Sequence, residues 1–303
     1  MSSGWSWFVI GLIVFNLGVT FFLFLWAPRA EVPVLADGTT GHAWASGTIR
    51  EGLHRLPRWW IVASFVMYFS AFGYLALFPG FGSHEGALDW TSEKELNAAT
   101  AANTARLEPV MQRLAALDID AVGADPQGRQ LGERLFIDNC AACHGRHGQG
   151  NQLLGAPNLG DDDWLWGGSA QDIVNSIRNG RTGAMPAWGA LGDAAVKNLA
   201  QYLLGLSGQA HDATAAAAGE TVFKATCIAC HGPDAKGNPM LGAPNLSDSV
   251  WLYGGTQQAI ETSIRDGRQG HMPAWSTRLS DQEIHVLTGY VHHLSQRGKA
   301  GTP

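Results

Sequence analysis

Two short cysteine motifs are the residues of this chain best suited to chemistry. The first reads Cys140-Ala-Ala-Cys143-His144, and the second, 87 residues later, reads Cys227-Ile-Ala-Cys230-His231. Two thiols at this spacing can add to the two vinyl groups of one porphyrin, and the following His is delivered to the iron on one face. Because Cys-x-x-Cys-His is the attachment pattern of c-type heme, the sequence predicts two covalently bound heme c groups.

A methionine follows each motif at the same distance. Met185 and Met272 each lie 42 residues after the second Cys of their motif, and each begins the sequence Met-Pro-Ala-Trp. A thioether opposite the histidine raises the heme potential, as in electron-carrying cytochromes c. We therefore predict His144 and Met185 as axial iron ligands in one copy and His231 and Met272 in the other. His271, beside Met272, is an alternative ligand.

Two other uses of a Cys-x-x-Cys pair have to be weighed, namely a thioredoxin-like redox couple and half of a zinc site. A redox couple needs no His after it, and a zinc site needs a further ligand from each copy. The chain has four cysteines, and all of them lie in the two motifs. A lone Met more often packs in a core than binds a metal, but here it recurs at equal spacing. These observations favour c-type heme.

The stretch around each motif is an internal repeat. Residues 140–188 and 227–275 align without a gap, and about 30 of the 49 aligned positions are identical. Such a repeat indicates a duplicated domain. We expect a first cytochrome c domain over 126–206, and a hinge followed by a second domain over 207–303.

Each copy has a helical pattern before its motif and another after its Met. The first helices carry Gly132 and Gly219 at matching positions, where the missing side chain lets another helix cross closely. We expect the crossing helix to be the one that follows in the same copy, with Asp193 and Asp281 as N-caps.

Four more residues are expected near the hemes. The carbonyls of Pro157 and Pro244 are placed to accept the Nδ1–H of the axial histidines, which would fix the tautomer of the ligand. Arg178 and Arg265 are candidates for pairing with a heme propionate. An ordinary surface salt bridge is the alternative for both arginines.

Two apolar runs precede the repeats. Residues 5–26 hold no charge, and residues 59–78 are apolar with aromatic residues at their edges. About 20 apolar residues suffice to cross a bilayer, so we expect two transmembrane helices within a membrane anchor over 1–82. A cleavable signal peptide, the alternative for the first run, would need a basic start that is missing. Residues 83–125 are expected to form a connector with a helix.

Positive charge is distributed unevenly around these runs. The loop over 27–58 contains several arginines, whereas residues 1–4 and 79–93 contain no Lys or Arg. By the positive-inside rule the loop lies in the cytoplasm, which places both termini and the heme domains in the periplasm, where heme c is attached. The arginines of the loop are Arg29, Arg50, Arg55 and Arg58.

The composition excludes one class of partner. Charged residues make up 15% of the chain, and the formal net charge is −6. Nucleic-acid binding depends on clustered Lys and Arg that neutralise phosphates, so nucleic acid is not an expected partner.

With these residues placed, the chain resembles the diheme cytochrome c subunit (subunit III) of cbb3-type cytochrome c oxidases over nearly its whole length. The resemblance is carried by Thr39-Thr-Gly-His42-Ala-Trp44, Leu56-Pro-Arg-Trp-Trp60 and Pro79-Gly-Phe-Gly82, in addition to the heme motifs. The chain departs from the family pattern at Ala45, where Asp is common, and at His54-Arg55, where Asn-Pro is more usual.

The resemblance implies an all-α protein in the bacterial inner membrane, with an N-terminal transmembrane helical hairpin followed by two tandem cytochrome c domains. It implies a subunit without a catalytic residue of its own that takes electrons from a donor c-type cytochrome. Its expected partners are the monoheme cytochrome c subunit and the catalytic heme–copper subunit, which reduces oxygen to water and pumps protons.

Two other functions fit parts of the sequence. A free-standing, membrane-anchored diheme carrier serving another reductase or dehydrogenase fits the heme motifs but not the loop motifs. A diheme peroxidase or a gas-binding sensor needs an open iron site, against which a Met at both sites argues.

Overall fold

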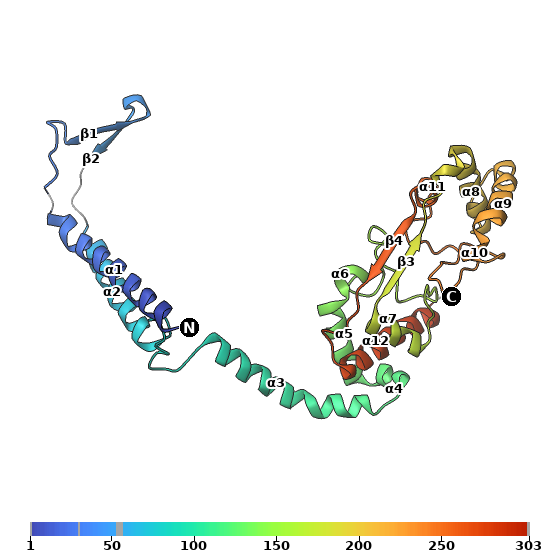
Figure 1. Cartoon of the computed structure of the whole chain (residues 1–303), viewed down its shortest axis with the longest axis horizontal. Helices are drawn as coiled ribbons and strands as arrows, with labels where there is room; N and C mark the ends of the chain where they lie inside the picture. Colours follow the sequence, from blue (N-terminus) through green and yellow to red (C-terminus); the bar gives the residue numbers. More distant parts are fainter. Residues whose placement is uncertain (1, 30, 53–56, 302–303) are drawn as a thin grey trace. The chain divides into compact units, whose positions relative to one another are not determined.

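The computed structural model describes residues 2–29, 31–52 and 57–301, and the chain forms two compact units whose boundary in the sequence lies between Ala105 and Arg106 (Figure 1). His54, Arg55 and Leu56, which entered the sequence predictions, lie outside the described residues.

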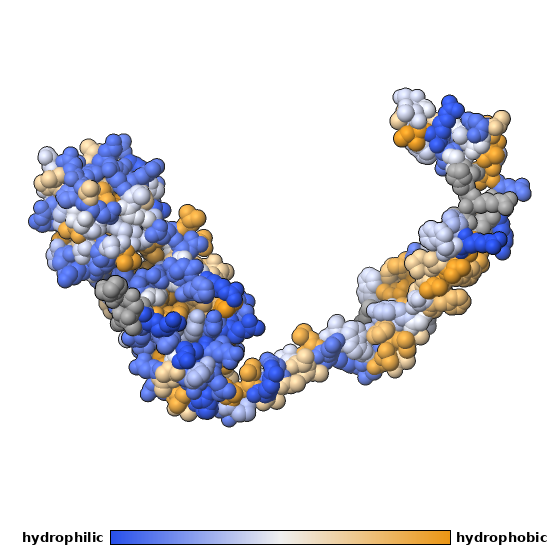
Figure 2. Space-filling model, turned by 180° about the vertical axis from the view of Figure 1, so that it is seen from behind, coloured by the Kyte–Doolittle hydropathy of each residue, from blue (hydrophilic) through white to orange (hydrophobic). Residues whose placement is uncertain are grey.

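Two long apolar helices dominate the first unit. They are α1 (Ser3–Trp26) and α2 (Arg58–Leu77), and they agree with the expected spans to within two residues. Both are long and apolar enough to cross a membrane, and one residue of each helix is buried, Ser6 in α1 and Ser64 in α2. Figure 2 shows apolar side chains along both helices. The ring of Phe24 on α1 lies 5.8 Å from that of Trp60 and 5.2 Å from that of Phe65 on α2. Exposed apolar surface of this extent marks a membrane or protein interaction site.

The chain after α2 folds back on the start of α1. The backbone N–H of Ser83 donates a hydrogen bond of 2.8 Å to Oγ of Ser6, the one buried residue of α1. Gly82 has a φ of +65° and lies so close that a Cβ there would be 2.5 Å from the Ser6 hydroxyl. The Pro79–Gly82 motif therefore needs its second glycine for both conformation and space.

A small β-hairpin lies between the two apolar helices in sequence. After the 3-10 turn η1 (Ala27–Arg29), the strands β1 (Thr39–Trp44) and β2 (Ile49–Gly52) pair antiparallel around the turn η2 (Ala45–Gly47). The motif from Thr39 to Trp44 is β1 itself. The prediction of an all-α chain was therefore wrong here, because this polar segment was assigned only as a loop.

The connector contains one long and one short helix. α3 (Ser92–Ala115) begins after Thr91, whose Oγ1 accepts a hydrogen bond of 3.0 Å from the Lys94 N–H. α4 (Ile119–Ala124) follows and is capped by Asp118. The next helix, α5, begins at Pro126, and the Asp125 carboxylate caps it by accepting the N–H groups of Gln127 and Gly128.

The heme-motif region of the second unit repeats one series of elements. The first copy contains α5 (Pro126–Asn139), α6 (Ala141–His144), α7 (Ala170–Asn179), β3 (Arg181–Met185), η3 (Gly189–Leu191) and α8 (Asp193–Leu206). The second contains α9 (Ala213–Thr226), α10 (Ile228–His231), α11 (Gln257–Asp266), β4 (Arg268–Met272) and α12 (Asp281–Gly301).

The last helix of each copy packs against the other copy. α12 packs on α5 and α7 of the first copy, and α8 packs on α9 and α11 of the second (Figure 1). A Cβ on Gly132 would lie 2.5 Å from Cβ of Tyr290 on α12, and one on Gly219 would lie 2.1 Å from the carbonyl oxygen of Asn198 on α8. Both glycines permit the expected close crossings. The prediction that these crossings occur within a copy was wrong.

A two-stranded sheet joins the copies as well. β3 and β4 pair antiparallel, with Arg181 opposite Met272 and Met185 opposite Arg268. This is the second departure from the expected all-α fold. No strand was expected here, because the pairing joins residues 83 to 91 positions apart and leaves no local signal in the sequence.

Each copy therefore contributes to two hydrophobic cores. The first core consists of Phe136, Ile173, Ile177, Leu279, Ile284, Leu287, Tyr290 and Val291. The second core consists of Val196, Leu199, Ala200, Leu203, Leu204, Phe223, Ala235, Ile260 and Ile264. A cut between residues 206 and 207 would divide both cores.

The helices α8 and α12 do not begin as expected. Asp193 and Asp281 are the first helical residues, and their carboxylates cap neither helix. Gly192 precedes α8 with a φ of +85°, and Ser280 caps α12 through reciprocal hydrogen bonds with Glu283. The Asp193 and Asp281 carboxylates instead form salt bridges with arginines of the other copy, as described below.

Candidate heme sites

Each Cys-x-x-Cys-His motif forms a single helical turn at the end of a longer helix. α6 follows α5 directly at Cys140, and α10 follows α9 directly at Cys227. The next residue is glycine in both copies, with a φ of +77° at Gly145 and +78° at Gly232, which ends the turn. Of the two thiols in each motif, the first contacts the core and the second is exposed. Burial raises the pKa of the Cys140 thiol to about 12.

The histidine of each motif points inward and is held by a proline carbonyl. His144 and His231 are each only 8% exposed. Their Nδ1 atoms lie 3.0 Å from the Pro157 oxygen and 3.1 Å from the Pro244 oxygen. Because a carbonyl only accepts, Nδ1 carries the proton and Nε2 keeps a free lone pair. Burial lowers the pKa of both imidazoles, which the proline hydrogen bond opposes. A neutral ring with a free Nε2 is what an iron ligand requires.

The methionines lie at the ends of β3 and β4. Met185 packs against the second core, which Cys227 also contacts. Met272 packs against the first core, which Cys140 also contacts. Each methionine thus lies with the cysteine motif of the other copy, and the pairing predicted from equal spacing is not the one the fold brings together.

His271 lies on the other face of its strand. Side chains alternate across a strand, and β4 follows this rule, with Met272 partly buried and His271 exposed. The His271 Nδ1 lies 3.1 Å from the Thr182 hydroxyl on β3. The structure therefore places Met272, and not His271, against the core.

One buried hydrogen-bond donor fits a large prosthetic group that supplies an acceptor. Among the described residues, the indole Nε1 of Trp251 is the buried side-chain atom that has no hydrogen-bond partner. Trp251 packs against the second core beside Cys227. A buried donor without an acceptor is costly, and a heme propionate provides such an acceptor. The residues present therefore fit heme c.

Two arginines that the sequence interpretation missed are held firmly. The guanidinium of Arg181 lies 5.1 Å above the Trp166 ring, and that of Arg268 lies 4.5 Å above the Tyr253 ring. The Nε–H of each arginine donates a hydrogen bond of 2.9 Å to a serine hydroxyl of its own copy. The internal repeat could have indicated these pairs, because the two arginines and the two aromatic residues each recur 87 positions apart.

Arg178 and Arg265 form salt bridges between the copies. Arg178 lies 2.8 Å from the Asp281 carboxylate, and Arg265 lies 3.5 Å from the Asp193 carboxylate. The structure thus contains the surface salt bridges that were the alternative to a propionate partner. Each salt bridge joins an arginine of one copy to the first residue of the last helix of the other copy, α12 or α8.

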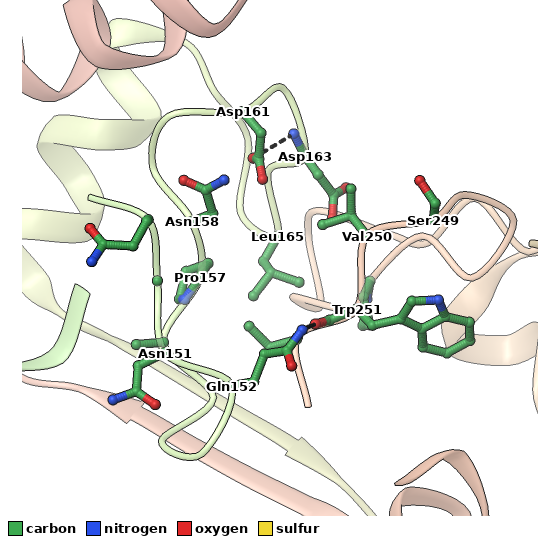
Figure 3. A pocket seen from close by; sticks show the side chains of 15 residues that line it. Asn151, Gln152, Pro157, Asn158, Asp161, Asp163, Leu165, Ser249, Val250 and Trp251 are labelled. Atoms are coloured by element: carbon green, nitrogen blue, oxygen red, sulfur yellow. Dashed lines mark hydrogen bonds between the residues drawn. The ribbon is translucent and has the colours of Figure 1, made fainter. Parts of the chain in front are cut away.

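Loops of both copies line a polar cavity of about 390 Å³ (Figure 3). Pro157 and Pro244, which hold the two histidines, both line it. The Gln152 amide donates a hydrogen bond of 2.9 Å to the Trp251 carbonyl across it. Burial, followed by the charges of Asp248 and Asp161, raises the pKa of Asp163 to about 6.

Known proteins match both units of the chain. Residues 128–203 and 214–291 match the family described as cytochrome c oxidase, cbb3-type, subunit III, and residues 36–85 match the N-terminal domain of cytochrome oxidase-cbb3, FixP. The chain belongs to the cbb3-type oxidase subunit III family. It is a membrane-anchored cytochrome c that acts as an electron-transfer subunit of this class of oxidase.

Relatives from this family align over most of their length. The cbb3-type cytochrome c oxidase subunit CcoP of Rubrivivax gelatinosus is 42% identical over 97% of this chain and 96% of its own. The subunit FixP of Bradyrhizobium sp. strain ORS 278 is 39% identical over 88% and 98% of the two chains. The subunit FixP of Azorhizobium caulinodans is 40% identical over 84% and 92%.

Proposed function

We propose that this subunit III carries two heme c groups and transfers electrons from a donor c-type cytochrome, through the monoheme cytochrome c subunit, to the catalytic heme–copper subunit of a proton-pumping cbb3 oxidase. The observation that carries the proposal is the doubled proximal site. Each Cys-x-x-Cys-His turn has a buried histidine whose Nδ1–H is fixed by a proline carbonyl.

The proposed ligand set uses every sequence-predicted site residue. Thioether bonds form at Cys140, Cys143, Cys227 and Cys230, and the axial ligands are His144, His231, Met185 and Met272. When bound, heme c supplies a one-electron couple at potentials raised by thioether ligation. The residues of this chain keep the imidazoles neutral and oriented, and both faces of the iron are closed. The subunit alone then exchanges electrons and does not turn over oxygen.

The proposed topology follows from the apolar helices and the arginines. The helices α1 and α2 span the inner membrane as a hairpin, the segment between them lies in the cytoplasm, and both termini and the heme unit lie in the periplasm. Of the described residues between the helices, Arg29 and Arg50 are exposed positive charges, which favours the cytoplasmic side.

The function is tested in the purified oxidase complex. Mass spectrometry should show two added hemes on this chain. Replacing both cysteines of either motif by Ala should remove one heme and sharply reduce oxygen consumption from reduced cytochrome c, because one carrier is missing. The exposed His147→Ala variant serves as the control and should behave like the unaltered complex. Full oxygen consumption after loss of both hemes would overturn the proposal, as would steady oxygen uptake by the isolated subunit.

The topology is tested in intact cells with an amine label that does not cross the membrane. Lys236, exposed on the heme unit, should be labelled. A lysine introduced at the exposed Ala45 should react only after permeabilisation. Labelling of Ala45→Lys from outside would contradict the orientation.

A further inference from the structure

We infer that the two methionine ligands are exchanged, so that Met272 binds the iron of the heme attached at Cys140 and Cys143, and Met185 binds the iron of the heme attached at Cys227 and Cys230. This inference rests on the proposed binding of two hemes. It adds that each heme is held by both copies, which equal spacing along the sequence does not indicate.

The first argument is the strand register. β3 and β4 run antiparallel, so Met185 and Met272 occupy opposite ends of a two-stranded ribbon. Because strands rise about 3.4 Å per residue, four residues separate the two positions by roughly 14 Å. Each methionine lies opposite the arginine that begins the other copy's strand. Met272 is thereby next to the end of α7, and Met185 is next to the end of α11.

The second argument is the anchoring of the chain after each methionine. The backbone N–H of Trp275 donates a hydrogen bond of 3.0 Å to the Ile177 carbonyl near the end of α7. In the same way, the backbone N–H of Trp188 donates a hydrogen bond of 2.9 Å to the Ile264 carbonyl near the end of α11. A Cβ at Gly180 would lie 2.5 Å from the Met272 carbonyl oxygen. The backbone around each methionine is therefore fixed against the other copy.

The third argument is the content of the cores. Met272 contacts the core that contains Phe136 and Ile177, with Cys140 at its edge. Met185 contacts the core that contains Phe223 and Ile264, with Cys227 at its edge. Ligation within a copy would require both strands to leave their ribbon and both methionines to change cores.

The fourth argument is the aromatic pair in each core. The ring of Phe136 lies 5.6 Å from that of Tyr290, and the ring of Phe223 lies 5.3 Å from that of Tyr202. Phe136 and Phe223 precede the cysteine motifs, whereas the tyrosines follow the exchanged methionines. The whole segment from each methionine through the last helix of its copy therefore packs on the other copy.

The exchange is tested in full-length chains that carry a single heme. The Cys227→Ala, Cys230→Ala chain keeps only the first heme. In this background, Met272→His should abolish the near-infrared sulfur-to-iron charge-transfer band and lower the midpoint potential, whereas Met185→His should leave both unchanged. The reciprocal background, Cys140→Ala, Cys143→Ala, should lose the band with Met185→His and keep it with Met272→His.

The opposite pattern, with Met185→His removing the band of the first heme, would overturn the exchange. Loss of the band with both single variants would also count against it. Two attached hemes and normal electron transfer in that case would leave the proposed function intact. Failure to attach two hemes in the unaltered chain would refute the proposed function itself.

A second measurement does not depend on the single-heme chains. In the reduced, unaltered chain, each ligating methionine has a methyl proton resonance shifted strongly upfield by the porphyrin ring, which is assigned by its loss in Met185→Leu or Met272→Leu. The Met185 methyl should show cross-relaxation with the Phe223 ring and the Met272 methyl with the Phe136 ring. Cross-relaxation of Met185 with Phe136 would overturn the exchange.

Discussion

The first and second cores arise from one repeated sequence, yet the first is joined to the connector and the second is not. A third cluster of Met111, Leu114, Val122 and Val286 extends the first core along α12. His285 of α12 also bonds through Nε2 to the Leu117 carbonyl at 2.9 Å. α8, the counterpart of α12, packs on α9, α11 and η3, and no similar layer covers it among the described residues.

This difference shows what duplication preserves and what the flanking chain adds. The buried histidines, their proline carbonyl partners and a methionine at the end of a paired strand recur in both cores. The outer surface of α12 is buried because the connector covers it. The first candidate site is therefore packed against the connector, and the second candidate site is packed, within the described part of the chain, only against the first copy.

The largest expected effect comes from filling the two helix crossings. Gly219→Leu should prevent α8 from packing on α9 and reduce attachment of the second heme, because even a Cβ would meet the Asn198 carbonyl at 2.1 Å. Gly132→Leu should be less severe, since its nearest contact is a side-chain carbon of Tyr290. Gly73→Leu, with no neighbour within 4 Å, is the control. Heme content per chain is the measurement, and equal attachment in Gly219→Leu and Gly73→Leu would contradict the crossing.

The next effect concerns the layer found only at the first core. Leu114 is fully buried in the third cluster, so Leu114→Ala should lower the free energy of unfolding by about 2–5 kcal/mol. Leu96→Ala, on the exposed face of the same helix, should change it by less than about 0.5 kcal/mol. Denaturant unfolding followed by tryptophan fluorescence measures both. A small effect at Leu114 would mean that the connector does not stabilise the first core.

A pH dependence should distinguish the copies as well. Asp163 in the first copy corresponds to Val250 in the second. Its pKa is raised from 3.8 to about 6, first by burial. The folded chain therefore binds a proton that the unfolded chain has lost, so stability should fall as pH rises from about 4 through about 6.

Asp163→Asn should remove this part of the pH dependence and be more stable than the unaltered chain at pH 7. Unfolding midpoints measured across pH 4–7 test it, with the exposed Asp138→Asn as control. Parallel curves for Asp163→Asn and the unaltered chain would contradict the raised pKa.

The smallest effect should come from the two salt bridges between the copies. Arg178–Asp281 and Arg265–Asp193 are both exposed, and exposed pairs contribute about 0.2–1 kcal/mol. Double-mutant cycles with Ala and Asn should give a larger coupling for Arg178–Asp281, whose distance is 2.8 Å rather than 3.5 Å. Equal coupling energies for the two pairs, or no coupling in either pair, would contradict the expected difference between the copies.

The sequence by itself determined the local chemistry of this protein. The cysteine motifs, the proline carbonyls and the membrane-spanning runs were predicted because each depends on residues close together along the chain or on a composition that needs no partner. The positions of the close crossings at Gly132 and Gly219 were also predicted, since a glycine indicates contact without saying with what.

Only the tertiary structure decided which copy completes which core. The expected hinge is short, because α8 ends at Leu206 and α9 begins at Ala213, so only residues 207–212 separate the two helices. A connection this short favours packing of two consecutive helices against each other. When α8 packs on α9, α5 packs on α12 instead. The strands β3 and β4, which precede α8 and α12 along the chain, are then placed in the other copy as well. Two similar copies offer similar surfaces, so this connection, and not the cysteine motifs or the methionines, distinguishes the exchanged pairing from the local one.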